Sequence, residues 1–155
     1  MHSFILCFIL LDSTPHQLNR CVVHARVLRV GVRQPHFVEN MRGSLALTHA
    51  GDHEVVIPPG GTAVLPTGIM LSIPGGFFGR IHGSLLQSTV YSVDTFNTIL
   101  RSGDKNEVMV HLINRHPHRK YTVHPGEEIG MMVVEKETFV LCIPLEMTDN
   151  DNEAC

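Results

Sequence analysis

With 155 residues, of which 43% are hydrophobic and 17% charged, the chain has the composition of one folded domain and not of a disordered segment. Twelve basic and fifteen acidic residues give a net charge of −3, and the sequence has no basic stripe that would suggest a nucleic acid as partner. The apolar run at 4–11 is too short for a membrane-spanning helix, and it lacks the basic start and the cleavage site of a signal peptide. We therefore expect an intracellular protein, cytoplasmic or nuclear, without membrane insertion.

Short apolar runs alternate along the chain with turns rich in proline and glycine, a pattern typical of an all-β barrel or sandwich. We expect β-strands at residues 21–30, 45–47, 55–57, 62–65, 69–73, 79–82, 95–100, 107–114, 120–123, 129–135 and 138–145. The single helical pattern covers 85–93 and is weak, because it is rich in serine, threonine and valine. The strands 95–100 and 107–114 are expected to form a hairpin with its tip at 101–106.

The composition divides the chain into three parts. Residues 1–19 are expected to form an extra strand or an apolar arm that packs on a neighbour. Residues 20–146 contain the strands and form the domain, and residues 147–155 form an acidic tail that we expect to be disordered.

Histidines gather near one turn, where His116 and His118 have the H-x-H spacing seen in some metal sites. No cysteine or carboxylate completes a recognisable ligand set around them, so exposed loop histidines are the expected outcome. We predict no metal site, with His116 and His118 as the weak candidates for one.

Four blocks of the sequence carry a family resemblance. They are VIPPG at 56–60, LPTG at 65–68, the pair IP and GRI within 73–81, and GEEIGMMVVEK at 126–136. In this order and at this spacing they resemble the dUTPase family, trimeric enzymes that cleave dUTP to dUMP and pyrophosphate. The resemblance covers roughly residues 20–136. It implies a dUTPase-like distorted jelly-roll barrel of short strands with at most one short helix, assembled as a homotrimer.

Two motifs of the family are altered in this chain. The first, A-G-x-D-L, falls on residues 42–46, where Leu45 replaces the acid that the resemblance assigns to organising hydrated Mg²⁺. A leucine cannot accept hydrogen bonds from metal-bound water. The second motif matches Gly83 and Ser84, but the basic residue that neutralises the triphosphate in the family is missing.

The third motif of the family aligns with this chain without a gap when positions are counted back from Glu107. The carboxylate that activates the attacking water in the family then falls on Arg101, which is no base at neutral pH. The tyrosine that stacks below the sugar falls on Asp104, which has no ring. Neither Asp104 nor Asp94 is expected to replace the acid, since odd offsets along a strand lie on opposite faces.

The rest of the family's nucleotide site is also altered. The glycine pair that lets uracil approach the hairpin falls on Asn97 and Thr98, whose Cβ atoms would intrude. The glycine-rich arm that closes over the phosphates has no counterpart, because no glycine follows residue 136. We therefore expect no catalytic residues, and at most a remnant nucleotide site of Gly83, Ser84, Asn97, Thr98 and Arg101.

These substitutions favour a non-catalytic protein that needs no cofactor. It resembles the dUTPase-derived proteins of adenoviruses and herpesviruses, which implies contacts with host signalling or scaffold proteins. PDZ domains are a weak candidate partner, because the tail 151–155 lacks Ser or Thr third from the end. Two alternatives stay open: an active, Mg²⁺-dependent dUTP pyrophosphatase with a diverged site, and a residual phosphate binder that uses Ser84 and Arg101.

Overall fold

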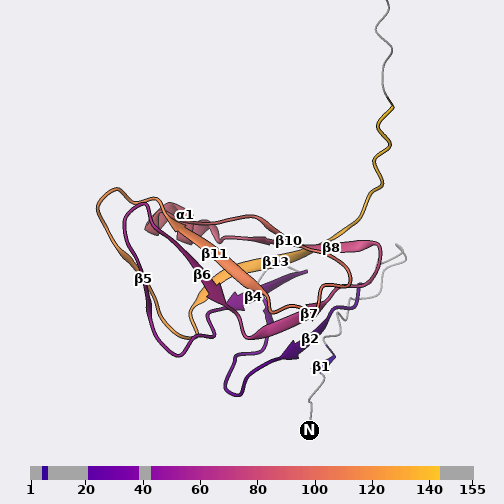
Figure 1. Cartoon of the computed structure of the whole chain (residues 1–155), viewed down its shortest axis with the longest axis horizontal. Coiled ribbons are helices and arrows are strands. Elements are labelled where there is room, and N and C mark those ends of the chain that lie inside the picture. Colours follow the sequence, from indigo (N-terminus) through magenta and orange to yellow (C-terminus); the bar gives the residue numbers. More distant parts are fainter. Residues whose placement is uncertain (1–4, 7–20, 39–42, 144–155) are drawn as a thin grey trace, which may run out of the picture.

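The computed structural model describes residues 5–6, 21–38 and 43–143. In this part of the chain there are thirteen short strands and one α-helix (Figure 1). The strands are β1 (Ile5–Leu6), β2 (His24–Val27), β3 (His36–Phe37), β4 (Ser44–Thr48), β5 (Val55–Ile57), β6 (Thr62–Pro66), β7 (Ile69–Ser72), β8 (Phe77–His82), β9 (Val93–Thr95), β10 (Thr98–Leu100), β11 (Met109–Asn114), β12 (Tyr121–Val123) and β13 (Glu128–Lys136), and the helix is α1 (Leu85–Tyr91). The predicted all-β class with one short helix is confirmed.

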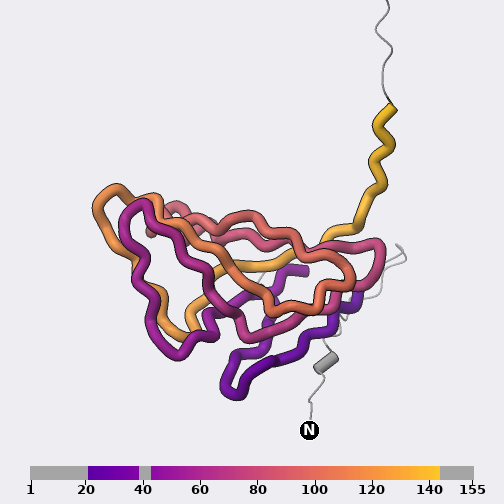
Figure 2. The backbone as a smooth tube through the Cα atoms, viewed as in Figure 1, coloured from indigo at the N-terminus to yellow at the C-terminus, as the bar shows by residue number. Residues whose placement is uncertain are grey.

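The strands pair into four antiparallel sheets, with the orders β1-β2-β7, β10-β8-β13-β4-β3, β6-β11-β9 and β12-β5. The long strand β13 is central to the largest sheet and pairs with β8 on one side and β4 on the other. Its Met132 lies opposite both Ile81 and Leu45. Figure 2 shows the chain leaving this compact body after β13, where residues 137–143 extend away from it.

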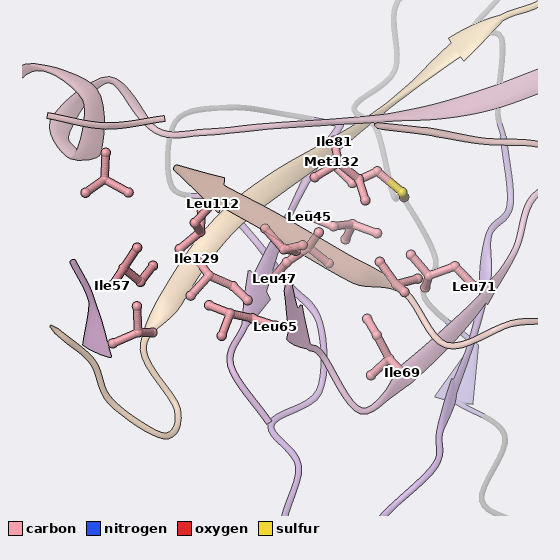
Figure 3. Close-up of a cluster of buried hydrophobic side chains, with 14 of the residues drawn as sticks. Leu45, Leu47, Ile57, Leu65, Ile69, Leu71, Ile81, Leu112, Ile129 and Met132 are labelled. Atoms are coloured by element: carbon pink, nitrogen blue, oxygen red, sulfur yellow. The ribbon is translucent and has the colours of Figure 1, made fainter. Parts of the chain in front are cut away.

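The apolar core lies between these sheets (Figure 3). Alternate residues of a strand point inward, as in β11, where Val110 and Leu112 are buried while His111 is exposed. Each fully buried aliphatic side chain of this kind contributes roughly 1.5–3 kcal/mol. The core therefore holds β8, β9 and β13 in fixed relative positions, and each of these strands contributes residues to the site described below.

The helix is shorter than the predicted range 85–93. It begins after Ser84, whose hydroxyl accepts the N–H of Gln87 while the Gln87 side chain accepts the N–H of Ser84, a reciprocal capping box. It ends at Ser92, which has a left-handed backbone with a φ of 56°. Val93 is then buried at the start of β9, so the last residue of the predicted helix belongs to a strand.

The predicted hairpin of 95–100 with 107–114 is wrong in part. The strand β9 pairs with β11 as expected, and the N–H of Phe96 still donates to the carbonyl of His111. The chain then changes sheets, and β10 pairs with β8, with Ile99 opposite Arg80. A strand that switches sheets at a bend looks like one continuous strand in the sequence when, as in residues 95–100, no proline or glycine interrupts it.

Several strand predictions differ from the structure at the chain's ends. The first strand is restricted to β2, the strand β3 has no predicted counterpart, and residues 138–143 of the last predicted strand form no strand. That last segment is exposed and pairs with no strand among the described residues, so β-propensity alone does not make it a strand. Residues 144–145, the acidic tail 147–155 and most of the arm 1–19 lie outside the described residues. The strand β1 within that arm pairs with β2.

Among the residues that the structure describes, no helix combines the length and the apolar character needed to cross a membrane.

Candidate functional site

A hollow of about 650 Å³ opens where β8, α1 and the connection from β9 to β10 meet. Three of the five predicted remnant residues, Gly83, Ser84 and Asn97, line this hollow. The other two, Thr98 and Arg101, do not. The remaining lining residues are His82, Leu85, Ser88, Val93, Asp94, Thr95, Phe96, Arg115 and Met131.

Gly83 and Ser84 both have structural roles at this place. A Cβ at Gly83 would lie 2.9 Å from the Thr95 hydroxyl oxygen, so a larger residue would displace β9. The Ser84 hydroxyl accepts the N–H of Gln87 at 3.2 Å as the N-cap of α1. Capping residues of this type stabilise a helix by about 1 kcal/mol, which is sufficient to account for a serine at this position.

The charged groups of the hollow neutralise each other. The Nε of Arg115 donates to one carboxylate oxygen of Asp94, and the hydroxyl of Ser88 donates to the other at 2.9 Å. The backbone N–H of Arg115 also donates to the carbonyl of Ser92, which fixes the start of this side chain. Apart from His82, these are the only charged or titratable side chains among the lining residues, so the hollow offers a triphosphate no unpaired cation.

The region predicted to have lost the catalytic acid lies outside the hollow, in an exposed turn after β10. The backbone N–H of Arg101 donates to the Asp104 carboxylate at 2.8 Å, and the N–H of Asp104 donates back to the carbonyl of Arg101 at 3.2 Å. Gly103 takes the positive φ that this turn requires. The Asp104 carboxylate therefore closes the turn. Thr98 similarly donates its hydroxyl to the carbonyl of Phe96 at 3.3 Å.

Leu45 is part of the hydrophobic core, with only 8% of its surface exposed. Its backbone lies between Phe37 of β3 and Met132 of β13. An aspartate in this position would bury a charge without a partner unless the surrounding core residues changed as well.

One of the two weak metal candidates, His116, has a structural role in its turn. The Nδ1 atom of His116 accepts the backbone N–H groups of His118 at 3.1 Å and of Arg119 at 2.9 Å. The same turn is held by Asn114, whose buried side chain donates to the carbonyls of Ile57 and Arg119. The described residues contain no cluster of three or more His, Cys, Asp or Glu side chains that could hold a metal ion.

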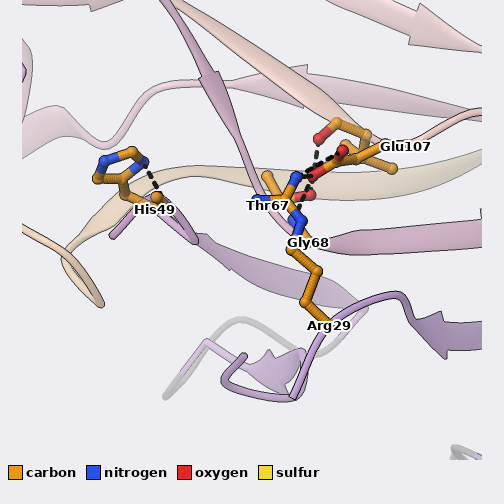
Figure 4. A network of polar contacts seen from close by, with 7 residues as sticks. Arg29, His49, Thr67, Gly68 and Glu107 are labelled. Carbon is orange, nitrogen blue, oxygen red and sulfur yellow. Dashed lines mark hydrogen bonds and ion pairs between the residues drawn. The ribbon is translucent and has the colours of Figure 1, made fainter. Parts of the chain in front are cut away.

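A second polar network fixes the segment that follows the exposed turn (Figure 4). Glu107 accepts two hydrogen bonds from Arg29, at 2.8 and 2.9 Å, and one from the N–H of Gly68 at 2.8 Å. Next to it, the Thr67 hydroxyl donates to the carbonyl of Val108 at 2.7 Å. Three segments far apart in sequence are thereby joined at the edge of the core.

Several lining residues are not predicted from the sequence. Arg115, Phe96, Leu85 and Ser88 carry no motif that marks them, and the sequence places Asp94 away from the site. Only the pairing of β9 with β11 places Ile113 opposite Asp94 and so brings Arg115 close to that carboxylate. No local signal in the sequence indicates this arrangement.

Known proteins resemble this chain in sequence. No family model matches the chain. It is 30% identical to the deoxyuridine 5'-triphosphate nucleotidohydrolase of Oryza sativa over 128 residues, which cover 80% of this chain and 72% of the relative. It is also 30% identical to the enzyme of that name from Syntrophotalea carbinolica over 115 residues, which cover 72% of this chain and 74% of the relative.

Solved structures of phage dUTPases have the same fold. A mutant of the dUTPase from Staphylococcus aureus phage phi11 superposes with a TM-score of 0.71 at 14% identity, covering 82% of this chain and 98% of that one. The dUTPase of Staphylococcus bacteriophage 80alpha in complex with dUpNHpp gives a TM-score of 0.71 at 16% identity, covering 82% of this chain and 89% of that one. The sequence relatives, the jelly-roll architecture of these structures and the four motif blocks agree, and the chain belongs to the deoxyuridine 5'-triphosphate nucleotidohydrolase (dUTPase) family.

Proposed function

We propose that this dUTPase-family protein does not hydrolyse dUTP and acts instead through protein–protein contacts. The observation that carries the proposal is the turn after β10. Where the family resemblance puts the water-activating carboxylate, this chain has Arg101, and the nearby Asp104 carboxylate accepts the Arg101 N–H. A guanidinium stays protonated at neutral pH and cannot act as a general base.

The residues around the hollow do not fit a magnesium ion. The solved phi11 phage dUTPase is described as coordinating a structural Mg(II) ion. Magnesium in nucleotide sites is held by carboxylates together with phosphate oxygens. The one carboxylate in the hollow, Asp94, is already bonded to Arg115 and Ser88, and Leu45 contributes core packing where the family has an acid. We therefore propose that the protein acts without a cofactor.

A regulatory role of this fold has a precedent among the structural relatives. The phage 80alpha dUTPase is described as controlling the transfer of virulence genes by a G protein-like mechanism. By analogy, we propose that this chain is an intracellular viral protein, cytoplasmic or nuclear, whose exposed surface contacts host signalling or scaffold proteins. A PDZ domain remains the weak candidate among these partners. The assembly we propose is the homotrimer that the family resemblance implies.

A dUTP hydrolysis assay tests the proposal directly. Purified protein is incubated with dUTP and Mg²⁺, and the release of pyrophosphate is measured beside one of the dUTPase relatives as a positive control. We expect no release above the rate without protein. Turnover that co-purifies with the folded protein would show that the chain is an enzyme.

One observation favours the alternative of an active enzyme with a diverged site. Asp94 lines the same hollow as Ser84 and Asn97, so an acid does lie beside the remnant residues. If turnover is found, Asp94→Asn and Asp104→Asn identify which carboxylate supports it. The first substitution would abolish turnover if the hollow is the active site, and the second if the exposed turn is.

Residual phosphate binding through Ser84 and Arg101 has less support. Ser84 lines the hollow and Arg101 does not, so one phosphate group in the hollow is not held by both residues. Calorimetric titration with a non-hydrolysable dUTP analogue tests this alternative, and heat of binding that disappears in Arg101→Ala would revive it.

A further inference from the structure

The connection between β11 and β12 gathers basic side chains at one end of the molecule. Residues 115–120 contain two arginines, one lysine and two histidines, and no acidic residue. Apart from Arg115, none of these side chains lines the hollow. Figure 1 shows the connection after β11 at the opposite end of the molecule from residues 137–143. We define residues 115–120 as the basic turn.

One buried side chain fixes the backbone of the basic turn. Asn114 has no exposed surface, and its amide nitrogen donates to the carbonyls of Ile57 at 3.0 Å and of Arg119 at 2.7 Å. Its amide oxygen accepts the N–H of His116 at 3.0 Å. A surface whose backbone is already ordered loses less conformational entropy when a partner binds. The turn is therefore a preorganised support for the side chains that it carries.

Two cationic side chains of the turn are unpaired in the described part of the chain. Arg119 and Lys120 are exposed, and neither side chain takes part in an ion pair or a hydrogen bond there. By contrast, Arg115 at the start of the turn is bonded to Asp94. The contacts within the fold thus explain Arg115 and the backbone of the turn, but they give no role to the charges at positions 119 and 120.

The backbone of the turn is not arranged to hold a compact anion. Compact oxyanions such as phosphate are commonly bound by several backbone N–H groups that converge on them. Here the N–H groups of His118 and Arg119 both donate to Nδ1 of His116, at 3.1 and 2.9 Å, and are already used. Without converging N–H groups, an anion has to be held by the side chains. This favours a ligand with several separate carboxylates over a single phosphate.

An aromatic pair borders the basic turn. Tyr121 directly follows Lys120, and its ring contacts the ring of Tyr91 at the end of α1, with 5.7 Å between the ring centroids. Tyr91 is 45% exposed, so part of its surface is open to a partner. Tyrosine and arginine are enriched among the residues that carry most of the binding energy of protein–protein interfaces. The surface therefore combines positive charge with aromatic area, as protein-binding sites do.

The charge of the chain argues against a membrane or a nucleic acid as the partner. The net charge is −3, and the turn has two fixed charges that are unpaired in the described part of the chain. Basic segments that bind anionic lipids have about four to eight Lys or Arg residues, and DNA-binding proteins commonly contact about six to ten phosphates. A short acidic segment of a protein, by contrast, is matched by a pair of cations beside an aromatic ring.

We propose that the basic turn and Tyr91 bind an acidic segment of a partner protein, with carboxylates on Arg119 and Lys120 and an apolar side chain on the ring of Tyr91. The inference rests on the proposed function, action through protein–protein contacts, and adds the surface that makes the contact and the charge of the partner. It needs neither a nucleotide nor a particular number of copies of the chain.

Fluorescence anisotropy with labelled hexaglutamate tests this surface in the full chain, with hexaglutamine as the uncharged peptide. Arg119→Glu with Lys120→Glu reverses both charges. Arg33→Glu with Lys105→Glu is the matched control, because it changes the net charge equally at exposed residues outside the turn. We expect the wild type and the control to bind hexaglutamate, and the reversal at 119 and 120 to weaken binding by about tenfold or more. Circular dichroism checks that both double variants are folded.

A second peptide tests the aromatic part of the surface. It has the same glutamates with a phenylalanine inserted between them. We expect the wild type to bind this peptide more tightly than hexaglutamate, and Tyr91→Ala to remove the gain while it leaves the affinity for hexaglutamate unchanged. Equal affinity of the wild type for the two peptides would overturn the role of Tyr91.

The remaining outcomes separate this inference from the proposed function. No binding of hexaglutamate, or equal weakening in both double variants, would overturn the basic turn as the site and leave the proposed function in place. Vesicles containing phosphatidylserine that bind the wild type more tightly than the peptides do would make the partner a membrane and would also overturn the inference. Turnover of dUTP, measured separately, would overturn the proposed function without changing the result with the peptides.

Discussion

Gly68, in the turn between β6 and β7, shows how single residues constrain this fold. Its φ is +67°, and a Cβ added there would lie 2.5 Å from a methyl carbon of Val32 and 2.9 Å from the Cβ of Ala50. Its N–H donates to Glu107 in the network of Figure 4. Backbone strain and lack of space therefore both require glycine at this position.

A series of three alanine substitutions separates these two causes. We predict that Gly68→Ala lowers the free energy of unfolding by about 2–4 kcal/mol, because it adds overpacking to a strained φ. Gly60→Ala, with a φ of +71° and no atom within 4 Å, isolates the strain and should cost about 1–2 kcal/mol. Gly75 has neither constraint, so Gly75→Ala should leave the free energy of unfolding unchanged. Urea denaturation measures all three, and equal losses at Gly68 and Gly60 would contradict the packing argument.

Ser92 is a residue in an unfavourable conformation. It has a φ of 56° at the end of α1, a position that glycine occupies at lower cost. We predict that Ser92→Gly raises the free energy of unfolding by about 0.5–1 kcal/mol. Ser88→Gly is the matched contrast inside the helix and should lower it by about 1 kcal/mol, since it also removes a hydrogen bond to Asp94. A rise in the free energy of unfolding in both variants would show that the strain of the left-handed backbone at Ser92 is not the cause.

At the scale of elements, Tyr121 joins the strand β12 to the turn before β13. Its hydroxyl donates to the Glu127 carboxylate at 2.7 Å, and its ring contacts that of Tyr91 on α1. Glu127 also accepts the N–H of His124. Burial first, and then the hydrogen bond to Glu127, raise the pKa of Tyr121 well above its ordinary value.

This raised pKa predicts how stability depends on alkaline pH. In the unfolded chain Tyr121 ionises at about pH 10, whereas the folded state keeps it neutral. The contribution of Tyr121 is therefore complete below pH 10 and is lost as the pH rises above it. Between about pH 9 and about pH 11, we expect the free energy of unfolding to fall less steeply in Tyr121→Phe than in the wild type. Urea denaturation at each pH measures this free energy, and an equally steep fall with pH in the two proteins would contradict the expectation.

At the scale of the whole molecule, the charges of the hollow predict how the stability of the protein responds to a nucleotide. Binding to the folded state alone stabilises it by about 2.7 kcal/mol when the ligand is at a hundred times its dissociation constant. The hollow has no unpaired Lys or Arg to bind the phosphates. We therefore expect no change in the melting temperature at millimolar dUTP analogue, with a dUTPase relative as the control that does shift. An upward shift would show that a nucleotide site persists.

Much of the fold could be predicted from local pattern. The predicted strands at 55–57, 62–65 and 79–82 agree with the structure to within two residues, because proline and glycine turns mark their ends. The change of sheet at Phe96 could not be predicted, since residue alternation does not show which neighbour a strand pairs with. The site was predictable only in part for the same reason: Gly83, Ser84 and Asn97 meet, while Thr98 and Arg101 lie elsewhere.

The sequence by itself determined the family, the all-β class and the identity of the residues at positions 45, 101 and 104, because motif order and residue chemistry are properties of the chain. Only the tertiary structure decided that Leu45 belongs to the core, that the Asp104 carboxylate closes a turn and that Asp94 and Arg115 neutralise each other in the hollow. Such arrangements depend on pairing between residues far apart in sequence, which no local periodicity encodes.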